Sequence, residues 1–406
     1  AKGYTVPEGE GYTDALAAVG ATGSVSFLFF SVCNGIGSGC SVVAAQSYGS
    51  GDEKLTRRAI ANAAYIMFVT ALIMGMVFLI LGNVFIEPIV GFLGATETIA
   101  PHAKAYASYI FYAAPFMMCS FVMNNHLRFQ GLATYGMVGI TTGAVLNIAL
   151  DPVMIFGMNL GVAGAGWATI ISQFVSFVIL LIGCSKGSNI HISIRNLKLN
   201  GYYLIQIVRG GLPSLARQSI ASIATISLNN AARPYGDVVI AAMGVVQRVM
   251  MFGASTMLGF GQGFQPFCGF NYGAKLIDRV KKGFWFCVKG SFGFLCLVAV
   301  LAFAFAPQLV SLFRDDPDVI ACGALALRLQ CCTFPFQSFI VMSNMMQQVT
   351  GKTGPATFMA VARQGIFFIP LVLFLPLAFG VLGIQMAQAI SCLLYTSPSP
   401  RDATLS

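Results

Sequence analysis

Residues 115–131, PFMMCSFVMNNHLRFQG, recur 220 positions further along the chain as PFQSFIVMSNMMQQVTG (335–351). The two copies share a proline, a phenylalanine, an asparagine and a glycine at the same spacing: Pro115/Pro335, Phe116/Phe336, Asn124/Asn344 and Gly131/Gly351. Two further pairs recur at offsets of 224 and 219: SYGSGDEKLTRRA (47–59) with NYGAKLIDRVKKG (271–283), and GVAGAGWA (161–168) with GVLGIQMA (380–387). Three matches at nearly one offset indicate an internal duplication.

The composition places both copies in a membrane. Of the 406 residues, 57% are hydrophobic and only 9% are charged, whereas soluble domains carry about 25% charged residues. The longest polar stretch, residues 185–200, is too short for a soluble domain. We therefore predict an all-α polytopic membrane protein.

Eleven apolar segments account for most of the chain, and all except the last are long enough to cross a hydrocarbon core of about 20 residues. They cover residues 15–45, 57–86, 99–127, 134–157, 161–184, 203–232, 237–268, 283–312, 319–347, 356–378 and 381–394. The loops between them alternate in charge. One set holds twelve cations: Lys54, Arg57, Arg58, Arg128, Lys186, Arg195, Lys198, Lys275, Arg279, Lys281, Lys282 and Lys352. The other set holds three, namely Lys104, Arg233 and Arg314.

The positive-inside rule assigns the first set of loops to the cytoplasm and residue 1 to the outside. The net charge of +9 therefore orients the chain in a bilayer and does not call for nucleic acid. The repeat spans an even number of crossings, so both halves insert with the same orientation. Parallel repeats of this kind are typical of transporters whose substrate site lies between the halves.

A duplicated six-helix bundle implies twelve helices, and the partner of segment 203–232 would precede residue 2. We therefore expect about eleven of twelve helices, in an N-terminal bundle (1–184), a cytoplasmic linker (185–200) and a C-terminal bundle (201–391). Residues 392–406 read CLLYTSPSPRDATLS, and the part from Cys392 to Asp402 resembles the conceptual translation of a transposon-derived sequencing adapter. We expect it to be non-native, because it interrupts the last apolar segment at membrane depth.

Several stretches together resemble the multidrug and toxic compound extrusion (MATE) family, in particular its bacterial multidrug branch. They are DALAAVGATGS, AAQSYGSGD, LNIALDPVMIFGMNLGVAGAGWATIISQ, GLPSLARQSIASIATISLNNAARPYGD and GFGQGFQPFCGFNYGAK, and the likeness covers residues 12–391. The resemblance implies two bundles forming a V around a central cavity, in the bacterial inner membrane. It also implies export of organic cations in exchange for H⁺ or Na⁺. Many members place an acid in the first helix. We expect that helix to be absent from this sequence, so no such carboxylate is assigned here.

Asp151 is the acid that lies inside an apolar segment, and such residues are functional candidates because they are costly to insert. Asn147 lies one turn earlier on the same face. Pro152 leaves the carbonyl of residue 148 without its usual donor and can kink the helix. We predict ion coupling at Asp151 and Asn147, by a proton or by Na⁺ held near the carboxylate. The alternative is that Asp151 only braces the kink through hydrogen bonds.

Three arginines lie several residues inside their segments, and one acid cannot neutralise them. Buried arginines pair with acids or carbonyls, or bind anionic groups, although those near an interface can also snorkel to it. The predicted cavity-lining residues are Asn124, Gln173, Gln265, Arg217, Arg248 and Arg363. The histidines are scattered, so we expect no metal site beyond the Na⁺ near Asp151, and no cofactor.

The leading hypothesis is a monomeric secondary antiporter that exports organic cations by alternating access. The alternative from the same superfamily is a flippase for lipid-linked oligosaccharides or peptidoglycan precursors, with the arginines binding phosphate. A membrane protein without transport activity is a third class, which the repeat disfavours. No ATP site or nucleophile–base pair is recognisable, so we do not expect an enzyme.

Overall fold

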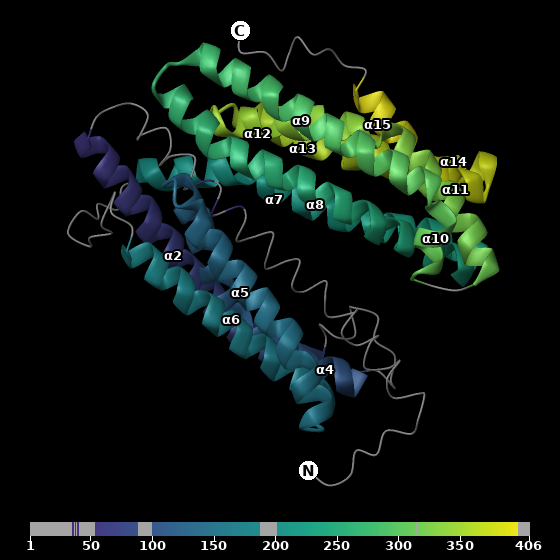
Figure 1. Cartoon of the computed structure of the whole chain (residues 1–406), viewed down its shortest axis with the longest axis horizontal. Coiled ribbons are helices and arrows are strands. Elements are labelled where there is room, and N and C mark those ends of the chain that lie inside the picture. The colour runs from purple at the N-terminus through teal and green to yellow at the C-terminus, as the bar shows by residue number, and fades with distance from the viewer. Residues whose placement is uncertain are drawn as a thin grey trace. The chain divides into compact units, whose positions relative to one another are not determined.

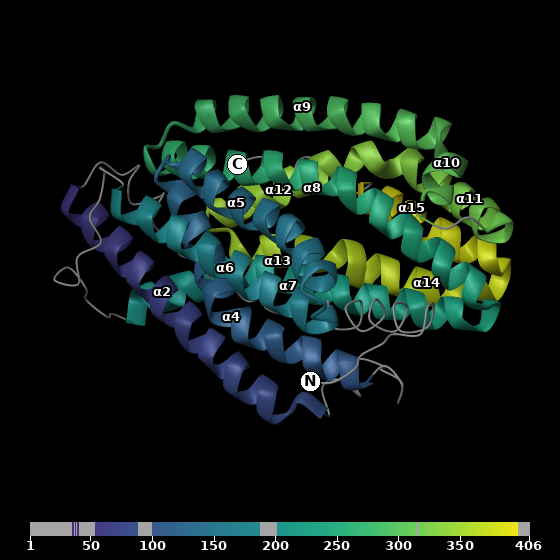
Figure 2. The ribbon, with the colours of Figure 1, turned by 60° about the horizontal axis from the view of Figure 1, so that its bottom comes forward.

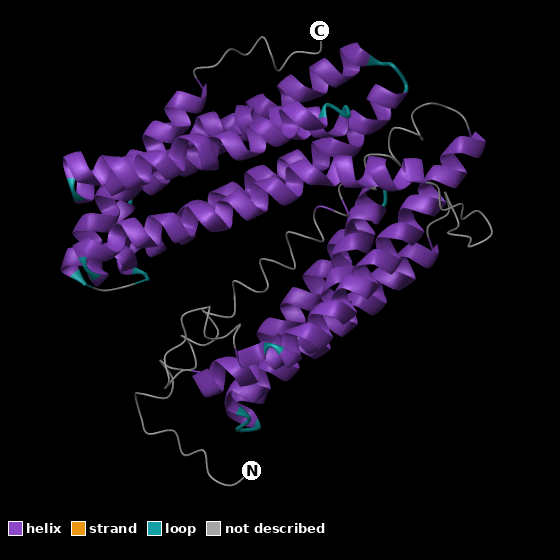
Figure 3. Ribbon diagram, turned by 180° about the vertical axis from the view of Figure 1, so that it is seen from behind, coloured by secondary structure: helices purple, strands orange, loops and turns teal. Residues whose placement is uncertain are grey.

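The computed structural model describes residues 35, 37, 39, 53–87, 100–186, 201–313 and 316–396. Within these ranges the chain forms helices and short turns, with no strand (Figure 1, Figure 3). The all-α prediction is therefore confirmed for the described part of the chain. The first predicted apolar segment (15–45) lies outside the described residues except at three glycines, and so do most of the linker and the last ten residues.

The chain divides into two compact units. The N-terminal unit comprises residues 1–47 and 52–211, and the C-terminal unit comprises residues 48–51 and 212–406. The division falls inside one helix, α7 (Gly201–Ala232), instead of in the polar stretch 185–200. The first part of α7 packs closely against the N-terminal unit because glycines, which have no side chain, lie at the contact. A Cβ added at Gly211 would lie 2.2 Å from the carbonyl oxygen of Gly35.

Four long helices form the described part of the N-terminal unit. They are α2 (Glu53–Val84), α4 (Ala100–Phe129), α5 (Ala133–Pro152, continued by a π-helical turn, Val153–Gly157) and α6 (Gly161–Lys186). Helix α4 packs against the other three. Its side chains Met118, Val122 and Leu127 are buried together with Leu180 of α6.

Helix α5 packs through glycine. Its only buried residues are Gly136, Gly139 and Gly143, spaced so that they share one face. A Cβ at Gly139 would lie 2.5 Å from Cγ of Leu180 on α6, so the absence of side chains lets the two backbones approach closely. The opposite face is apolar and exposed, as at Ile148 (72% exposed), which suits contact with lipid.

The C-terminal unit contains the rest of α7, then α8 (Asp237–Gly273) and α9 (Ile277–Ala304), followed by the short α10 (Ala306–Ser311). Helices α11 (Pro317–Thr333) and α12 (Gln337–Val349) flank a 3₁₀ turn, and α13 (Thr353–Val361) and α14 (Ile369–Phe379) flank a π-helical segment, Ala362–Phe368. Helix α15 (Val381–Thr396) follows. Helix α9 packs alongside α8, and α11 and α12 pack against both; α9 runs along the top of Figure 2.

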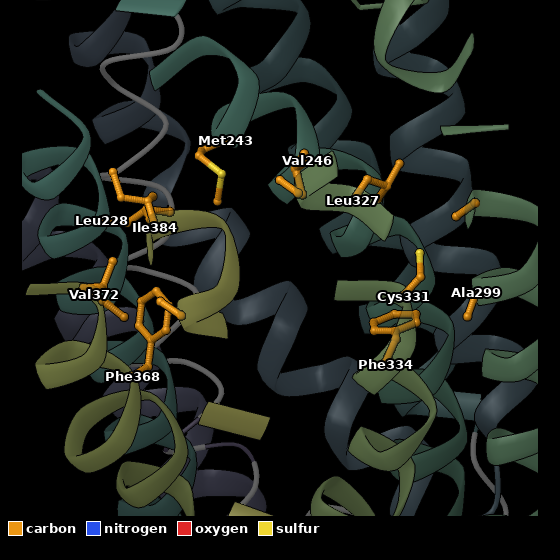
Figure 4. Close-up of a cluster of buried hydrophobic side chains, with 14 of the residues drawn as sticks. Leu228, Met243, Val246, Ala299, Leu327, Cys331, Phe334, Phe368, Val372 and Ile384 are labelled. Atoms are coloured by element: carbon orange, nitrogen blue, oxygen red, sulfur yellow. The ribbon is translucent and has the colours of Figure 1, made fainter. Parts of the chain in front are cut away.

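The core of the C-terminal unit is built mainly from one apolar cluster drawn from most of its helices (Figure 4), with two smaller clusters beside it. Leu228 of α7, Met243 of α8 and Ile384 of α15 lie on one side of the close-up, and Leu327 and Phe334 lie on the other. Tyr395 of α15 is also buried, and its hydroxyl donates to the carbonyl of Met359 at 3.3 Å. Residues 392–396, predicted to lie outside the bundle, thus continue α15 in this structure.

The helices have the length that a membrane requires. Seven of them in the described residues are long and apolar enough to span a bilayer. Two predicted segments, 319–347 and 356–378, are each built from two successive helices. The apolar runs predict the two spans, but they do not predict the break inside each span. The 3₁₀ turn includes Pro335, which cannot donate a backbone hydrogen bond.

The predicted duplication is confirmed in the backbone. Gly131 and Gly351, which are 220 positions apart, have φ of 82° and 81°. Gly161 and Gly380, 219 positions apart, have φ of 55° and 56°. Left-handed backbone favours glycine because other residues clash there, so each unit uses glycine to make the same two turns between helices.

Candidate ion-coupling and substrate sites

The last turn of α5 places Asp151 beside an irregular stretch of backbone. Pro152 ends the regular α-helix, and the next five residues form a π-helical turn in which Met158 N–H donates to the carbonyl of Val153 at 2.9 Å. Because proline has no N–H, the carbonyl one turn before it lacks its usual donor. Asp151 is half-buried, and it lies about 9 Å from the end of the α5–π segment at 1.5 Å per residue.

Asp151 is near polar side chains from three helices. Asn147 of α5 directs Nδ2 toward Oδ1 of Asp151 at 3.5 Å, the outer limit of a hydrogen bond, which confirms that the two share a face. Tyr106 of α4 interacts electrostatically with Asp151 and shares a side-chain hydrogen bond with Thr169 of α6. The Thr169 hydroxyl also donates to the carbonyl of Ala165 at 2.9 Å. This set of four residues is called the Asp151 cluster.

Two members of the Asp151 cluster, Tyr106 and Thr169, were not predicted. Each is one hydroxyl in an apolar segment, and the sequence offers no sign that separates it from the other hydroxyls there. Helix packing supplies the missing information, because α4 packs against both α5 and α6. The cluster offers carboxylate, amide and hydroxyl oxygens, which suit a proton or a hard cation such as Na⁺.

The other predicted cavity residues of the N-terminal unit lie apart from each other. Gln173 is half-buried on α6, one turn after Thr169 and therefore on the same face. Asn124 is near the far end of α4, where Nδ2 lies 2.9 Å from the position that a Cβ would take at Gly136. Asn124 thus packs against the start of α5 instead of the Asp151 cluster.

The C-terminal unit contains a polar network around α12, where twelve of the thirteen residues are buried. Arg217 of α7 directs Nη1 toward Oδ1 of Asn344 at 3.5 Å, and Nδ2 of Asn344 donates to the carbonyl of Ala356 at 2.6 Å. Gln265 of α8 donates to Oε1 of Gln348 at 3.4 Å, and Nε2 of Gln348 donates to Ser214 Oγ at 2.9 Å. Gln265 therefore bridges α8 and α12.

The other two arginines differ from each other. Arg363 lies in the π-helical segment, is half-buried, and interacts electrostatically with Arg217. Its backbone carbonyl accepts from Ser391 Oγ at 2.7 Å. Arg248 of α8 is exposed in the isolated chain. The structure thus brings Arg217 and Arg363 together and leaves Arg248 outside the network.

Ion pairing does not balance these charges within the described residues. The ion pair found there joins Lys104 and Glu87 at 2.7 Å, at one end of the N-terminal unit. The hydrogen bond and charge of Lys104 lower the pKa of Glu87. In the C-terminal half, the described acids lie near helix ends, at positions 237, 278, 316 and 318, and the sequence adds Asp315 and Asp402.

Together, the duplicated bundles, the membrane-spanning helices and the polar clusters inside them define a multi-pass transporter of the parallel-repeat class. The MatE family model matches residues 12–153 and 213–374, and the chain belongs to this family. The sequence-based resemblance is thereby confirmed.

Individual relatives agree with the family. The chain is 28% identical over 321 residues to the probable multidrug resistance protein YoeA of Bacillus subtilis, covering 76% of this chain and 67% of that protein. It is 26% identical over 323 residues to the multidrug export protein MepA of Staphylococcus aureus, covering 78% and 70%.

Solved structures show the same fold. An outward-facing multidrug resistance MATE family transporter of the MOP superfamily matches with a TM-score of 0.86 at 25% identity, covering 94% of this chain and 85% of that one. A MATE structure in the straight conformation matches with a TM-score of 0.87 at 24% identity and supports the fold alone.

Proposed function

We propose that this protein is a secondary antiporter of the bacterial cytoplasmic membrane that exports organic cations in exchange for H⁺ or Na⁺. In this proposal it works as a monomer, needs no cofactor, and alternates access between its two bundles. Residue 1 lies outside and residues 185–200 lie in the cytoplasm. The family and the multidrug relatives support export, and the Asp151 cluster carries the coupling.

The chemistry of coupling follows from the Asp151 cluster. A carboxyl group surrounded by apolar helices is costly to keep charged, so it favours a bound proton or cation. Asn147, Tyr106 and Thr169 add oxygen atoms that can share that ion. The carbonyl that Pro152 leaves without a helix donor offers another oxygen at the same place. Loss of the ion then leaves a bare carboxylate, which attracts a cationic substrate or the next coupling ion.

The test measures coupled exchange in everted membrane vesicles containing the protein expressed from its full genomic reading frame. Tetraphenylphosphonium, an amphipathic organic cation, is added to vesicles that hold either a pH gradient or a Na⁺ gradient. We expect it to collapse one gradient with the parent protein. Asp151→Asn should slow that collapse at least tenfold, because the amide cannot exchange an ion.

Asp278→Asn is the matched control, because it removes the same charge from an exposed position in the first turn of α9. It should leave the exchange unchanged. An Asp151→Asn protein that collapses the gradient at the parental rate would overturn the coupling role.

One observation favours the alternative function. Arg217 and Arg363 lie together and form no ion pair with a carboxylate in the described part of the chain, and arginine binds phosphate well. A flippase for phosphate-linked lipid precursors would use such a pair. Growth of a flippase-deficient strain on this gene, without a gain in drug tolerance, would favour that function over drug export.

A further inference from the structure

We propose that Arg217 and Arg363 form a binding site in the C-terminal unit for the anionic group, a carboxylate or a phosphate, of an amphipathic molecule. The proposal deepens the proposed transport function by adding zwitterions and anions to the substrates. Its first evidence is the packing of the two segments, because a Cβ at Gly365 would lie 3.1 Å from the side chain of Ile220 on α7. Arg363 and Arg217 are each within one turn of this contact, so two guanidinium groups from different helices meet there. Like charges held together repel, and an anion between them relieves that repulsion.

The depth of Arg217 excludes the usual alternative. An arginine near a helix end reaches water by extending its side chain along the helix. Arg217 is near the middle of the 32-residue α7, about 22–24 Å from either end at 1.5 Å per residue. Arg363 is ten residues into its segment, about 15 Å from the start of α13. Neither side chain can reach the end of its helix by snorkelling.

The two arginines also keep unused hydrogen-bond donors. A guanidinium carries five N–H donors, and the contact recorded for Arg217 is the single one to Asn344 at 3.5 Å. The guanidinium of Arg363 has no hydrogen bond in the described part of the chain. Arg328 shows the contrast, because it donates to the carbonyl of Phe303 at 3.4 Å and lies 5.6 Å from the centre of the Phe303 ring.

Helix α12 orients the site through Asn344. The 2.6 Å bond from Asn344 Nδ2 to the carbonyl of Ala356 fixes the amide, so Oδ1 faces Arg217. Asn344 is therefore a positioning residue for the guanidinium.

The acids of the chain cannot serve as the missing counter-charge inside the C-terminal half. The sequence has no Asp or Glu from 202 to 236, from 238 to 277, from 279 to 314, or from 319 to 401. The described acids Asp237, Asp278, Asp316 and Asp318 lie at helix ends. A charge at membrane depth is stable only when it is paired or solvated, so the counter-charge is supplied by a ligand.

Binding is tested with four aromatic probes of similar size: the anions 1-naphthyl phosphate and 1-naphthoate, the cation 1-naphthylmethylammonium, and uncharged 1-naphthol. The full-length protein is purified into phosphatidylcholine nanodiscs, and equilibrium binding of each radiolabelled probe is measured. We expect both anions to bind more tightly than uncharged 1-naphthol. Arg217→Gln and Arg363→Gln should each weaken anion binding about tenfold, the effect of one lost charged hydrogen bond.

Three controls make the result specific. Arg279→Gln removes an exposed positive charge from the start of α9 in the same unit and should change anion binding less than twofold. Arg217→Lys keeps the charge but loses the planar fork, so its affinity for 1-naphthyl phosphate should fall between those of the parent and Arg217→Gln. This variant replaces Arg217→Gln in the comparison if the latter does not fold. Folding of each variant is checked by gel filtration and by the thermal transition of tryptophan fluorescence.

The source of the anion is resolved by changing the lipid. If a lipid headgroup occupies the site, nanodiscs rich in phosphatidylglycerol should weaken 1-naphthyl phosphate binding to the parent protein but have no effect on the residual binding of Arg217→Gln. If the site takes soluble anions, lipid composition should not matter.

Anion binding no tighter than that of 1-naphthol, or equal in all arginine variants, would overturn the proposal. Because this readout needs no ion gradient, it is independent of the Asp151 coupling test. Loss of coupling with intact anion binding, or the reverse, identifies which of the two proposals has failed.

Discussion

At the scale of single residues, the two units place opposite charges inside their helices. In the N-terminal unit the Asp151 carboxyl group lies near Asn147 and Tyr106, and Thr169 bonds to Tyr106. In the C-terminal unit Arg217 and Arg363 lie near each other. The charge of each site follows from which residue type the sequence has at membrane depth, and its chemistry follows from the neutral side chains that packing brings to it.

Tyr106 is the residue-scale test of the Asp151 cluster. Tyr106→Phe removes the hydroxyl that bonds Thr169 but keeps the ring, so the coupling ion loses one shared oxygen contact. We expect the apparent affinity for the coupling ion to fall by about threefold to tenfold, the value of one neutral hydrogen bond, with little change in maximal rate. The measurement is the initial rate of gradient collapse as a function of ion concentration.

Tyr109→Phe is the matched control on the same helix. The Tyr109 ring lies 5.9 Å from that of Trp167, and its hydroxyl has no hydrogen bond in the described residues. An equal loss of affinity in both variants would mean that the hydroxyl of Tyr106 has no special part in coupling.

At the scale of helices, glycine sets how closely neighbours approach. Gly164 near the start of α6 and Gly383 near the start of α15 are 219 positions apart, and each lies against the backbone of the preceding helical segment. An added Cβ would lie 2.7 Å from Met154 backbone atoms in one case and 2.5 Å from Leu375 backbone atoms in the other. The two units therefore repeat a tight pair of helices as well as the turn that joins them.

Gly143 is the test of close packing between α5 and α6. A Cβ at this position would lie 2.8 Å from Cβ of Ser176 and 3.1 Å from the carbonyl oxygen of Ser172. Because the second contact is with backbone, the helices must separate, and Gly143→Ala should lower the free energy of unfolding by about 1–3 kcal/mol, as other overpacked sites do. Thermal melting of the purified parent and variant proteins in detergent ranks their stabilities.

Gly157→Ala is the comparison, because a Cβ there would have no atom within 4 Å. It should be neutral or stabilise by about 0.5–1 kcal/mol through reduced backbone entropy. Equal melting temperatures for the two variants would show that the glycine face of α5 does not determine the spacing of the helices.

At the scale of the whole molecule, the number of acids in the membrane limits how transport is driven. Within the described spans, Asp151 is the acid that lies more than one residue inside its span, six residues before the end of Ala133–Gly157. One carboxyl group exchanges one monovalent ion at a time. Exchange of one proton for one monovalent cation moves no net charge, so membrane voltage does no work on it.

The whole-molecule prediction follows from this stoichiometry for the proton-coupled case. In proteoliposomes, a pH gradient should drive tetraphenylphosphonium uptake by about 1.4 kcal/mol per pH unit. A potassium diffusion potential of 100 mV, set with valinomycin and corrected for protein-free liposomes, should add nothing. If voltage contributes about 2.3 kcal/mol per 100 mV, more than one proton is exchanged and a second acid takes part.

The sequence by itself determined the class, the spans and the duplication. Hydrophobic runs of bilayer length and glycines that repeat at a fixed offset are local or periodic signals, and the bilayer leaves helices as the main solution for such runs. The pairing of Asn147 with Asp151 was also predictable, because residues four apart on a helix share a face.

Only the tertiary structure decided which residues from different helices meet. Tyr106 and Thr169 join Asp151, and Arg363 meets Arg217 whereas Arg248 does not, although all three arginines look alike in sequence. The breaks at Phe334–Phe336 and Ala362–Phe368 also lie inside continuous apolar runs. Contacts between helices depend on rotation and spacing set by many small packing contacts, and no short stretch of sequence contains that information.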